Sequence, residues 1–599
     1  MENPRLRAAL FFPRRIVWAV LTLLIIPTLT FGALRYAMIS ETPYPPEMAE
    51  RLGLDQPMGE QYIQYLGRLL QGDLGTSLTT RQPVTETIGQ RLPATLGLVG
   101  LSLLVSVLLS ALIVALGVLV LKVRARIFVV GSILQRLGQL VVAIVIAAPL
   151  FLLGIYLMWL FSVKSAWFPA AGFADRGSER AFDLNHAVLP MLTLAVLPAC
   201  LTARAVLGEI VRFRSGPLGH RGRRVAHITL SFLENTLCQT VGLLGGTLLV
   251  ESVFSLPGVG RLFIQAIQSR DLTVLHGLLY LFAVLTLILR GMAAVVHGID
   301  GFILTPLQTT QQDAENQSPI EKPRYVKILA WLWIAFCVLL ILVPVVRGLL
   351  GFVAGGEIPM QVNPADANLP PGSQSADGHI YAWGTDSIGR DLRSRVLYAL
   401  GMNLVTSFAV ALVVSIPGLI FGLLAGALVR RGALWADLLD DLLMFPWDVL
   451  ASWPGLVLLV FLLALTEYSL LLLLICLGLA FILPRCVRMV RDGWRSGISQ
   501  TSVWLRLIGV FLGSLASGVG LALVMQPTLG FIGLGVHPPT PELGSIIAEG
   551  LRRLFASPYA VLRPGWVLVS AALGWFLFAD TILSKCGIHA RGTWAAPNR

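Results

Sequence analysis

Long apolar runs constrain this sequence more than any other feature. About twelve of them occur in the chain, and each is long enough to cross a bilayer, since a hydrocarbon core of about 30 Å takes roughly 20 helical residues. Only 13% of the 599 residues are charged, against about 25% in a soluble domain. Because a helix satisfies its own backbone hydrogen bonds in lipid, we predict an all-α integral membrane protein with about 12 transmembrane helices.

A polar segment at 306–325 divides these runs into two groups of six. The runs of the first group lie at about 16–39, 95–121, 138–161, 187–208, 230–252 and 274–296. Those of the second group lie at about 326–346, 401–428, 442–465, 468–488, 503–526 and 564–584. The sequence therefore predicts three parts, namely a first half at 1–305, a flexible cytoplasmic linker at 306–325, and a second half at 326–599.

Matching motifs indicate that the halves are parallel repeats. Gly384–Asp391 (GTDSIGRD) precedes a long apolar run, and Gly72–Ser77 (GDLGTS) does the same about 310 residues earlier. Before the last run of each half lies a glycine- and proline-rich element, VESVFSLPGVGR in the first and GLGVHPPTPELG in the second. Parallel repeats place a pathway between the halves. We expect the following residues to line or gate it: Glu251, Pro257, Gly258, Gly533, Gly535, Pro538 and Pro539.

Arginine-rich loops set the predicted orientation. Basic residues crowd the short loops at 122–136, 212–224, 430–431 and 485–495, and the positive-inside rule places such loops in the cytoplasm. Both termini are then cytoplasmic, and the segments 41–93 and 350–395 face outward. The net charge of +12 follows from these loops, so we expect the lipid bilayer as a partner and no nucleic acid.

Signatures of catalysis are absent from the sequence. No GxxxxGK[ST], HExxH or GxSxG motif occurs, and the six cysteines form no CxxC pair. Arg290 falls inside an apolar run and is either a functional residue or one that snorkels to the interface. Acidic residues near the ends of the runs are expected to be solvated; they are Glu209, Glu234, Glu251, Asp437, Asp440 and Asp441. We therefore predict a conduit without catalytic, cofactor or metal sites.

These motifs resemble a known family. The first half resembles the B-type permease of bacterial peptide and nickel ABC importers, through LDQP at 54–57, GDLGTS at 72–77, RLPAT at 91–95 and the element from Glu251 to Gly260. The second half resembles the C-type permease, through Gly384–Asp391, Ser394-Arg395, Tyr398 and the element from Gly533 to Gly544. The resemblance implies a type I importer fold in the bacterial inner membrane, with B-like and C-like permeases fused.

The resemblance also implies partners. Two ABC ATPase subunits would bind ATP, and an extracytoplasmic solute-binding protein would deliver the solute. The residues expected at the outer mouth, where that protein would dock, are Asp55, Asp73, Gly75, Asp386, Arg390 and Asp391. Those expected in the loops that couple to the ATPases are Arg214, Gly219, Arg223, Arg224, Arg491, Gly493 and Arg495. Neither coupling loop carries the Glu-Ala-Ala pattern that is typical of the family.

Several functions remain open at this point. Peptides are the first expectation for the solute, and nickel or a metallophore is the second. An ion-coupled secondary transporter would need ionisable residues deep in the spans, where Arg290 is the nearest example. A membrane scaffold that does not transport is the third class.

Overall fold

Helices make up most of the residues that the structure describes. The computed structural model describes residues 56–126, 128–170, 184–212, 221–315, 324–354, 361–375, 378–431, 434–450, 454–464, 475–495, 503–536 and 539–585, with a few residues between 21 and 32. We call the elements before residue 316 the N-terminal helices. They are α3 (Met58–Leu70), α4 (Val84–Arg126), α5 (Phe128–Ala147), α6 (Leu150–Met158), the π-helix η1 (Trp159–Lys164), α7 (Leu184–Arg212), α8 (Arg221–Val253), α9 (Val259–Gln268) and α10 (Leu272–Glu315).

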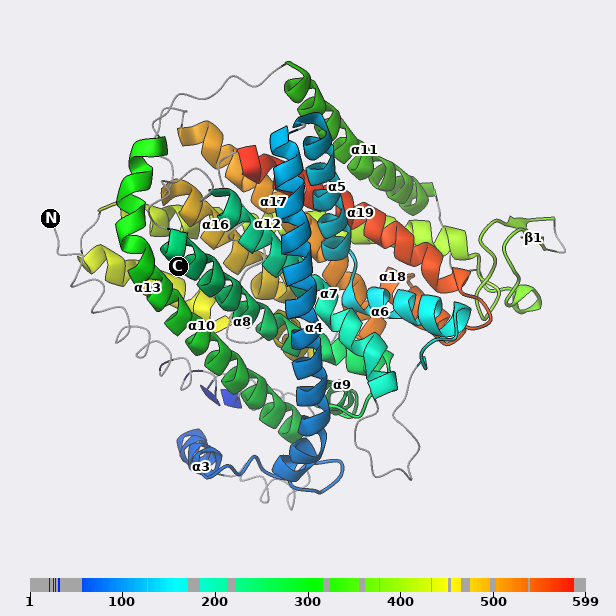
Figure 1. Cartoon of the computed structure of the whole chain (residues 1–599). Helices are drawn as coiled ribbons and strands as arrows, with labels where there is room; N and C mark the ends of the chain where they lie inside the picture. The colour runs from blue at the N-terminus through cyan, green and yellow to red at the C-terminus, as the bar shows by residue number, and fades with distance from the viewer. Residues whose placement is uncertain are drawn as a thin grey trace.

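The C-terminal helices begin at Arg324. They are α11 (Arg324–Ala354), the 3₁₀-helix η5 (Pro364–Asp366), α12 (Leu392–Arg431), α13 (Leu434–Leu450), α14 (Gly455–Ala464), the π-helix η6 (Gly478–Ile482), α16 (Leu483–Arg495), α17 (Val503–Ile532), α18 (Leu543–Leu551) and α19 (Tyr559–Lys585). Two short strands, β1 (Ser373–Gln374) and β2 (Ile380–Tyr381), pair antiparallel before α12. They form a small lobe beside the bundle, at the right of Figure 1.

Eight helices within the described residues are long and apolar enough to cross a membrane, or nine if a bent pair is one span. The bent pair joins 140–147 to 150–164 at an angle of 100°, where Pro149 ends one helix because proline supplies no N–H. The expected total of about 12 is therefore not confirmed. Most of the run at 16–39 and parts of those at 442–465 and 468–488 lie outside the described residues.

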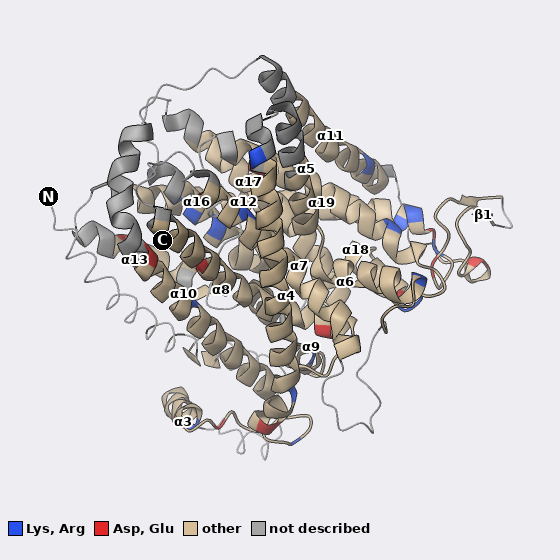
Figure 2. Cartoon of the chain, in the orientation of Figure 1, with Lys and Arg blue, Asp and Glu red and all other residues tan. Residues whose placement is uncertain are grey.

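The predicted linker is partly helical. Helix α10 continues to Glu315, and α11 begins at Arg324, so residues 306–315 are helical, and the role of 306–325 as a flexible linker stays a prediction. Most of the described helical ribbon in Figure 2 is neither acidic nor basic, as expected of membrane helices.

Two ends of the bundle are used as landmarks below. The motif end carries residues 72–83 and 384–391, which lie immediately before α4 and α12. The arginine end is the opposite one, where α7 ends at Arg212 and α8 begins at Arg221. Helices α4, α10, α12 and α19 all run away from the motif end, which lies toward the lower right of Figure 1.

Candidate functional site

The first glycine run forms a closed loop at the start of α4. Thr76 pairs with Pro83 in an isolated β-bridge, and the backbone N–H of Val84 donates to the carbonyl of Gly75 at 2.9 Å. Gly75 has a φ of 84°, a conformation that glycine adopts without strain. Asp73 accepts a hydrogen bond from the Gly75 N–H at 2.9 Å. These residues therefore shape the entry to the helix.

The second glycine run closes in the same way. Thr385 pairs with Asp391 in an isolated β-bridge, and the N–H of Leu392 donates to the carbonyl of Gly384 at 3.1 Å. Gly384 has a φ of 82°. In both loops a glycine with positive φ precedes the bridged threonine, and the long helix begins immediately after the bridge partner. The likeness seen between the two runs thus extends to their backbone geometry.

Asp386 is the centre of an ion network at the motif end. Its carboxylate pairs with Arg390 at 2.6 Å and also with Arg395. Both guanidinium groups reach Glu549 on α18, at 3.3 and 3.0 Å. Burial alone would raise the pKa of Asp386, but Arg395 and the N–H donors of Arg390 and Ile388 outweigh it, and its pKa lies below the ordinary value. The network ties the loop to α12 and α18.

Asp391 caps α12. It accepts hydrogen bonds from the backbone N–H of Ser394 at 3.0 Å and from the Ser394 hydroxyl, as N-cap residues do. The side chains of Asp386 and Arg390 are only 9% and 12% exposed. A docking role for these residues stays a prediction, and any docking surface there would consist mainly of the surrounding loop.

A second buried carboxylate lies at the end of α8. Glu251 is 1% exposed; it accepts from the Thr95 hydroxyl at 2.6 Å and from the Arg261 N–H at 3.0 Å. The same Thr95 hydroxyl accepts the N–H of Val259 at 2.8 Å. A Cβ on Gly258 would overlap the carboxylate, so a larger residue there would displace the Glu251 side chain. Pro257 beside it is exposed.

The C-terminal helices hold a comparable element between α17 and α18. Glu542 is 3% exposed and accepts the N–H of Val536 at 2.8 Å. Gly530 and Gly535 pack so closely on its carboxylate that a Cβ on either would overlap it. Burial raises the pKa of Glu542 to about 8, although the Val536 hydrogen bond lowers it. In each element, glycine backbone therefore surrounds a buried acid.

Four further residues were predicted to line the pathway or to form the outer mouth, and the structure describes two of them. Gly533 has a φ of 93°, and Pro539 is exposed. Asp55 and Pro538 lie outside the described residues. Pathway and docking roles for all of them stay predictions.

The N-terminal and C-terminal helices meet along a surface that we call the seam. Near the motif end, the ring of Phe151 on α6 stacks on that of Phe531 on α17, with centroids 4.4 Å apart. Tyr156 and Trp566 meet edge to face at 6.0 Å. A Cβ on Gly565 would lie 2.5 Å from Leu152, so α6 and α19 approach closely. Aromatic contacts therefore close the seam at this level.

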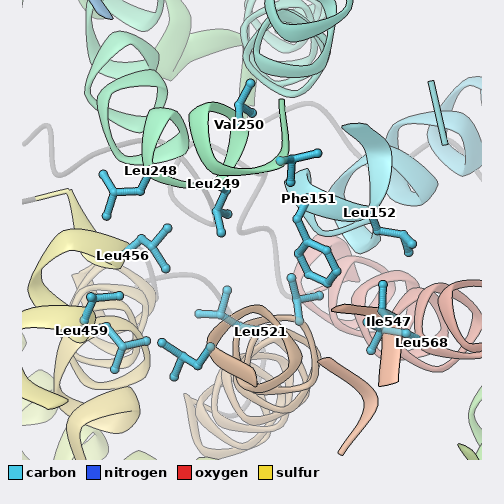
Figure 3. Close-up of a cluster of buried hydrophobic side chains, with 14 of the residues drawn as sticks. Phe151, Leu152, Leu248, Leu249, Val250, Leu456, Leu459, Leu521, Ile547 and Leu568 are labelled. Atoms are coloured by element: carbon cyan, nitrogen blue, oxygen red, sulfur yellow. The ribbon is translucent and has the colours of Figure 1, made fainter. Parts of the chain in front are cut away.

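Leucines of both sets of helices meet in the seam. Figure 3 shows Leu248 and Leu249 of α8 facing Leu456, Leu459 and Leu521 of α14 and α17. These leucines belong to one buried cluster that spans both sets of helices. Leucine side chains offer no hydrogen bonds to a polar solute, so a polar solute would not be stabilised among them.

Two short helices with similar beginnings line the seam. Helix α6 follows Pro149, and α14 follows Pro454. A Cβ on Gly245 of α8 would lie 2.9 Å from the Cβ of Pro454, and Leu458 packs against Ala283 of α10. Interrupted apolar segments at corresponding places in two repeats are a pointer to a transport site. The seam is therefore the candidate functional site.

Several acids are not solvated, contrary to the sequence-based expectation. Glu209, Glu251 and Asp440 are buried at 6%, 1% and 4% exposure. Asp440 pairs with Arg491, and Glu209 lies 3.5 Å from His227. Apolar runs predict where a helix lies but not which of its faces a basic partner covers.

The predicted coupling residues are described only in part. Arg214 and Gly219 lie outside the described residues. Arg223 and Arg224 belong to the first turn of α8, and Gly493 and Arg495 to the end of α16. Arg491 pairs with Asp440 of α13. Their coupling role stays a prediction.

Sequence reasoning missed two acids that organise the loops at the motif end. Asp271 accepts from the Ser77 hydroxyl and from the N–H of Thr79, so it holds the first glycine run. Asp366 accepts from the hydroxyls of Ser375 and Tyr381 at 2.7 and 2.9 Å. The sequence could have indicated Asp271, because it lies just before an apolar run. No local pattern in the sequence indicates a role for Asp366. In the described part of the chain, no group of three or more His, Cys, Asp and Glu side chains could hold a metal ion.

Comparisons with known proteins decide the family. The chain is 32% identical over 261 residues to the glutathione transport system permease GsiC of Salmonella paratyphi A, which covers 41% of this chain and 80% of that protein. It is 30% identical over 312 residues to a peptide transport system permease of Brucella suis, which covers 48% of this chain and 96% of that protein. The chain belongs to the peptide-type ABC importer permease family. No family model matches it.

Family membership has direct consequences. A peptide-type ABC importer permease is a multi-pass membrane transport subunit and not an enzyme. ATPase and solute-binding partners follow in general from such a transport system. We expect the transport pathway of this permease to lie along the seam, where the N-terminal helices meet the C-terminal helices.

Proposed function

We propose that this chain combines a B-like and a C-like permease in one polypeptide and moves peptides into the cytoplasm by ATP-driven alternating access. The relatives named for glutathione and peptide transport carry this proposal. Each covers less than half of this chain, a length that suits one half of a fused pair. The paired glycine loops and the seam between the two sets of helices support the same arrangement.

The partners follow from this proposal. Two ATPase subunits bind ATP, and this chain binds no cofactor of its own. A solute-binding protein docks at the motif end, which faces outward, while both chain termini lie in the cytoplasm of a bacterial inner-membrane protein. The arginine end then faces the ATPases, as the positive-inside rule favours.

The solute is tested by uptake. Cells that express the chain with its ATPase and binding-protein partners are given labelled glutathione or labelled dialanine, and accumulation is compared with that in cells lacking the chain. We expect accumulation that stops when the ATPases cannot hydrolyse ATP. Uptake of labelled nickel in place of both peptides would assign a metal or metallophore solute. Peptide uptake that persists without ATP hydrolysis would overturn the proposal.

Coupling is tested by deletion. Removal of residues 212–224 or 491–501 is expected to abolish uptake while the chain still inserts in the membrane. Persistence of uptake after both deletions would show that these loops do not couple transport to the ATPases.

A further inference from the structure

One ion pair crosses the seam. The guanidinium of Arg204 on α7 donates to the carboxylate of Asp580 on α19, 376 positions later in the chain. The two side chains are 29% and 34% exposed. The pair therefore joins an N-terminal helix to a C-terminal helix, and protein covers its two side chains only in part.

The pair lies toward the arginine end. Arg204 comes late in α7, one and a half turns before Glu209, which contacts His227 at the start of α8. On α19, Arg563 donates to the carbonyl of Ala382 at 3.3 Å, near the motif end. Asp580 follows Arg563 in the same helix by about 25 Å, at a rise of about 1.5 Å per residue. The ion pair and the aromatic contacts of the seam therefore lie toward opposite ends.

The ion pairs between α8 and α10 stay within the N-terminal helices. His227 pairs with Asp300 at 2.6 Å and His297 with Glu234 at 3.1 Å, which joins α8 to α10. Such pairs can hold a rigid body together. A pair that crosses the seam has a different consequence, because it must break whenever the two sets of helices separate at that level.

Charge is a costly way to close a seam inside a membrane. Apolar residues of similar volume often stabilise a buried contact as well as an ion pair does, and leucines of both sets of helices already pack together in this seam. Ionisable groups in membrane segments mark pathways and moving parts. Since protein encloses neither side chain completely, the pair can separate without disrupting a packed core.

We propose that Arg204 and Asp580 act as positioning residues that close the arginine end of the seam in the state described here and separate when that end opens. The inference rests on the proposed transport function. It adds a specific, breakable contact at one end of the seam, opposite the aromatic contacts of Phe151 with Phe531 and of Tyr156 with Trp566.

Cross-linking between the two sets of helices tests the proposal. Arg204→Cys and Asp580→Cys are introduced into a full chain whose native cysteines are replaced. That background is needed because Cys200 lies one turn before Arg204 on α7. A specific protease site inserted within 316–323 lets cleavage separate the two parts on a denaturing gel unless a short bifunctional thiol reagent has joined them. Tyr156→Cys with Trp566→Cys is the matched pair at the other end.

The readout is the cross-linking yield in membranes that also contain the ATPase partners, with no nucleotide and with ATP trapped by vanadate. We expect the 204/580 and 156/566 yields to change in opposite directions between these conditions, by on the order of fivefold or more. Equal yields of the 204/580 pair in both conditions would overturn the proposal, because a purely structural contact does not respond to nucleotide.

A charge swap provides a second measurement. Arg204→Asp and Asp580→Arg should each reduce labelled-glutathione uptake by on the order of fivefold or more, and the double swap should restore it. Glu234→Gln, which removes a pair inside the N-terminal helices, should leave the 204/580 yields dependent on nucleotide. Failure of the double swap to restore uptake, at unchanged protein abundance, would contradict the ion-pair role. Failure of the wild-type chain to take up any peptide, with the nucleotide response intact, would instead contradict the assigned solute.

Discussion

The hydroxyl of Thr95 donates to the carboxylate of Glu251 at 2.6 Å, and both side chains are almost completely buried. Thr95 lies on α4 and Glu251 at the end of α8, 156 positions apart. The same hydroxyl accepts the N–H of Val259, so one side chain joins three helices. Replacing this hydroxyl by a methyl group therefore tests how much the contact between the three helices contributes to stability.

Thr95→Val should destabilise the chain by about 1–3 kcal/mol, because it removes one hydrogen bond from the Glu251 carboxylate, which keeps that of the Arg261 N–H, and it takes away the acceptor of the Val259 N–H. Thr193→Val is the matched control, since the buried Thr193 hydroxyl donates only to the carbonyl of Leu189 in its own helix. Thermal unfolding in detergent measures both variants. Equal losses would show that the three-helix contact adds nothing.

Gly389→Ala should destabilise the loop before α12 more than Gly372→Ala does. Both glycines have positive φ, 81° and 85°, so both variants carry the same backbone strain. A Cβ at Gly389 would also overlap the carbonyl of Asn363, whereas nothing lies within 4 Å of one at Gly372. Limited proteolysis of 361–391 compares them; similar cleavage rates would contradict the close approach.

Glu542 should make stability depend on pH. Its pKa is raised from 4.5 to about 8 by burial, so the folded state favours the neutral acid. That stabilisation is complete below about pH 4.5, declines as the pH rises toward about 8 and is lost above it. Glu542→Gln stays neutral and should flatten this decline. Melting temperatures measured across that range would contradict the assignment if both proteins had the same slope.

Phe151→Ala should cost about 3–5 kcal/mol, as expected for a fully buried phenylalanine. Part of this comes from the stack with Phe531 across the seam. A double-mutant cycle with Phe531→Ala should give a coupling of about 0.5–1.5 kcal/mol beyond the loss of area. Additive effects of the two substitutions would show that the rings do not interact.

Apolar runs and motifs in the sequence were sufficient to predict an all-α membrane protein and its permease family. Apolar runs predicted the helices, because crossing lipid requires long uninterrupted apolar helix. The two glycine runs predicted matching loops, because a positive φ at Gly75 and Gly384 is a local demand that the sequence displays directly. These features depend on residues close together in the chain.

Long-range pairing could not be read in the same way. The sequence around Glu251 does not predict Thr95 as its partner, and the sequence around Arg204 does not predict Asp580. Each partner lies more than a hundred positions away. Acids at helix ends were therefore expected in solvent, and Glu209, Glu251 and Asp440 are instead buried. Only packing decides which face of a membrane helix meets a partner.

The continuity of the chain from α10 into α11 has a further consequence. With Glu315 and Arg324 in one polypeptide, the two sides of the seam are made in equal amounts and meet at a local concentration in the millimolar range, as short tethers give. The two sides do not have to find each other by diffusion in the membrane before they associate. The contacts of the seam are then free to be weak, and a weak interface is one that can open and close repeatedly without the two sides being lost to each other.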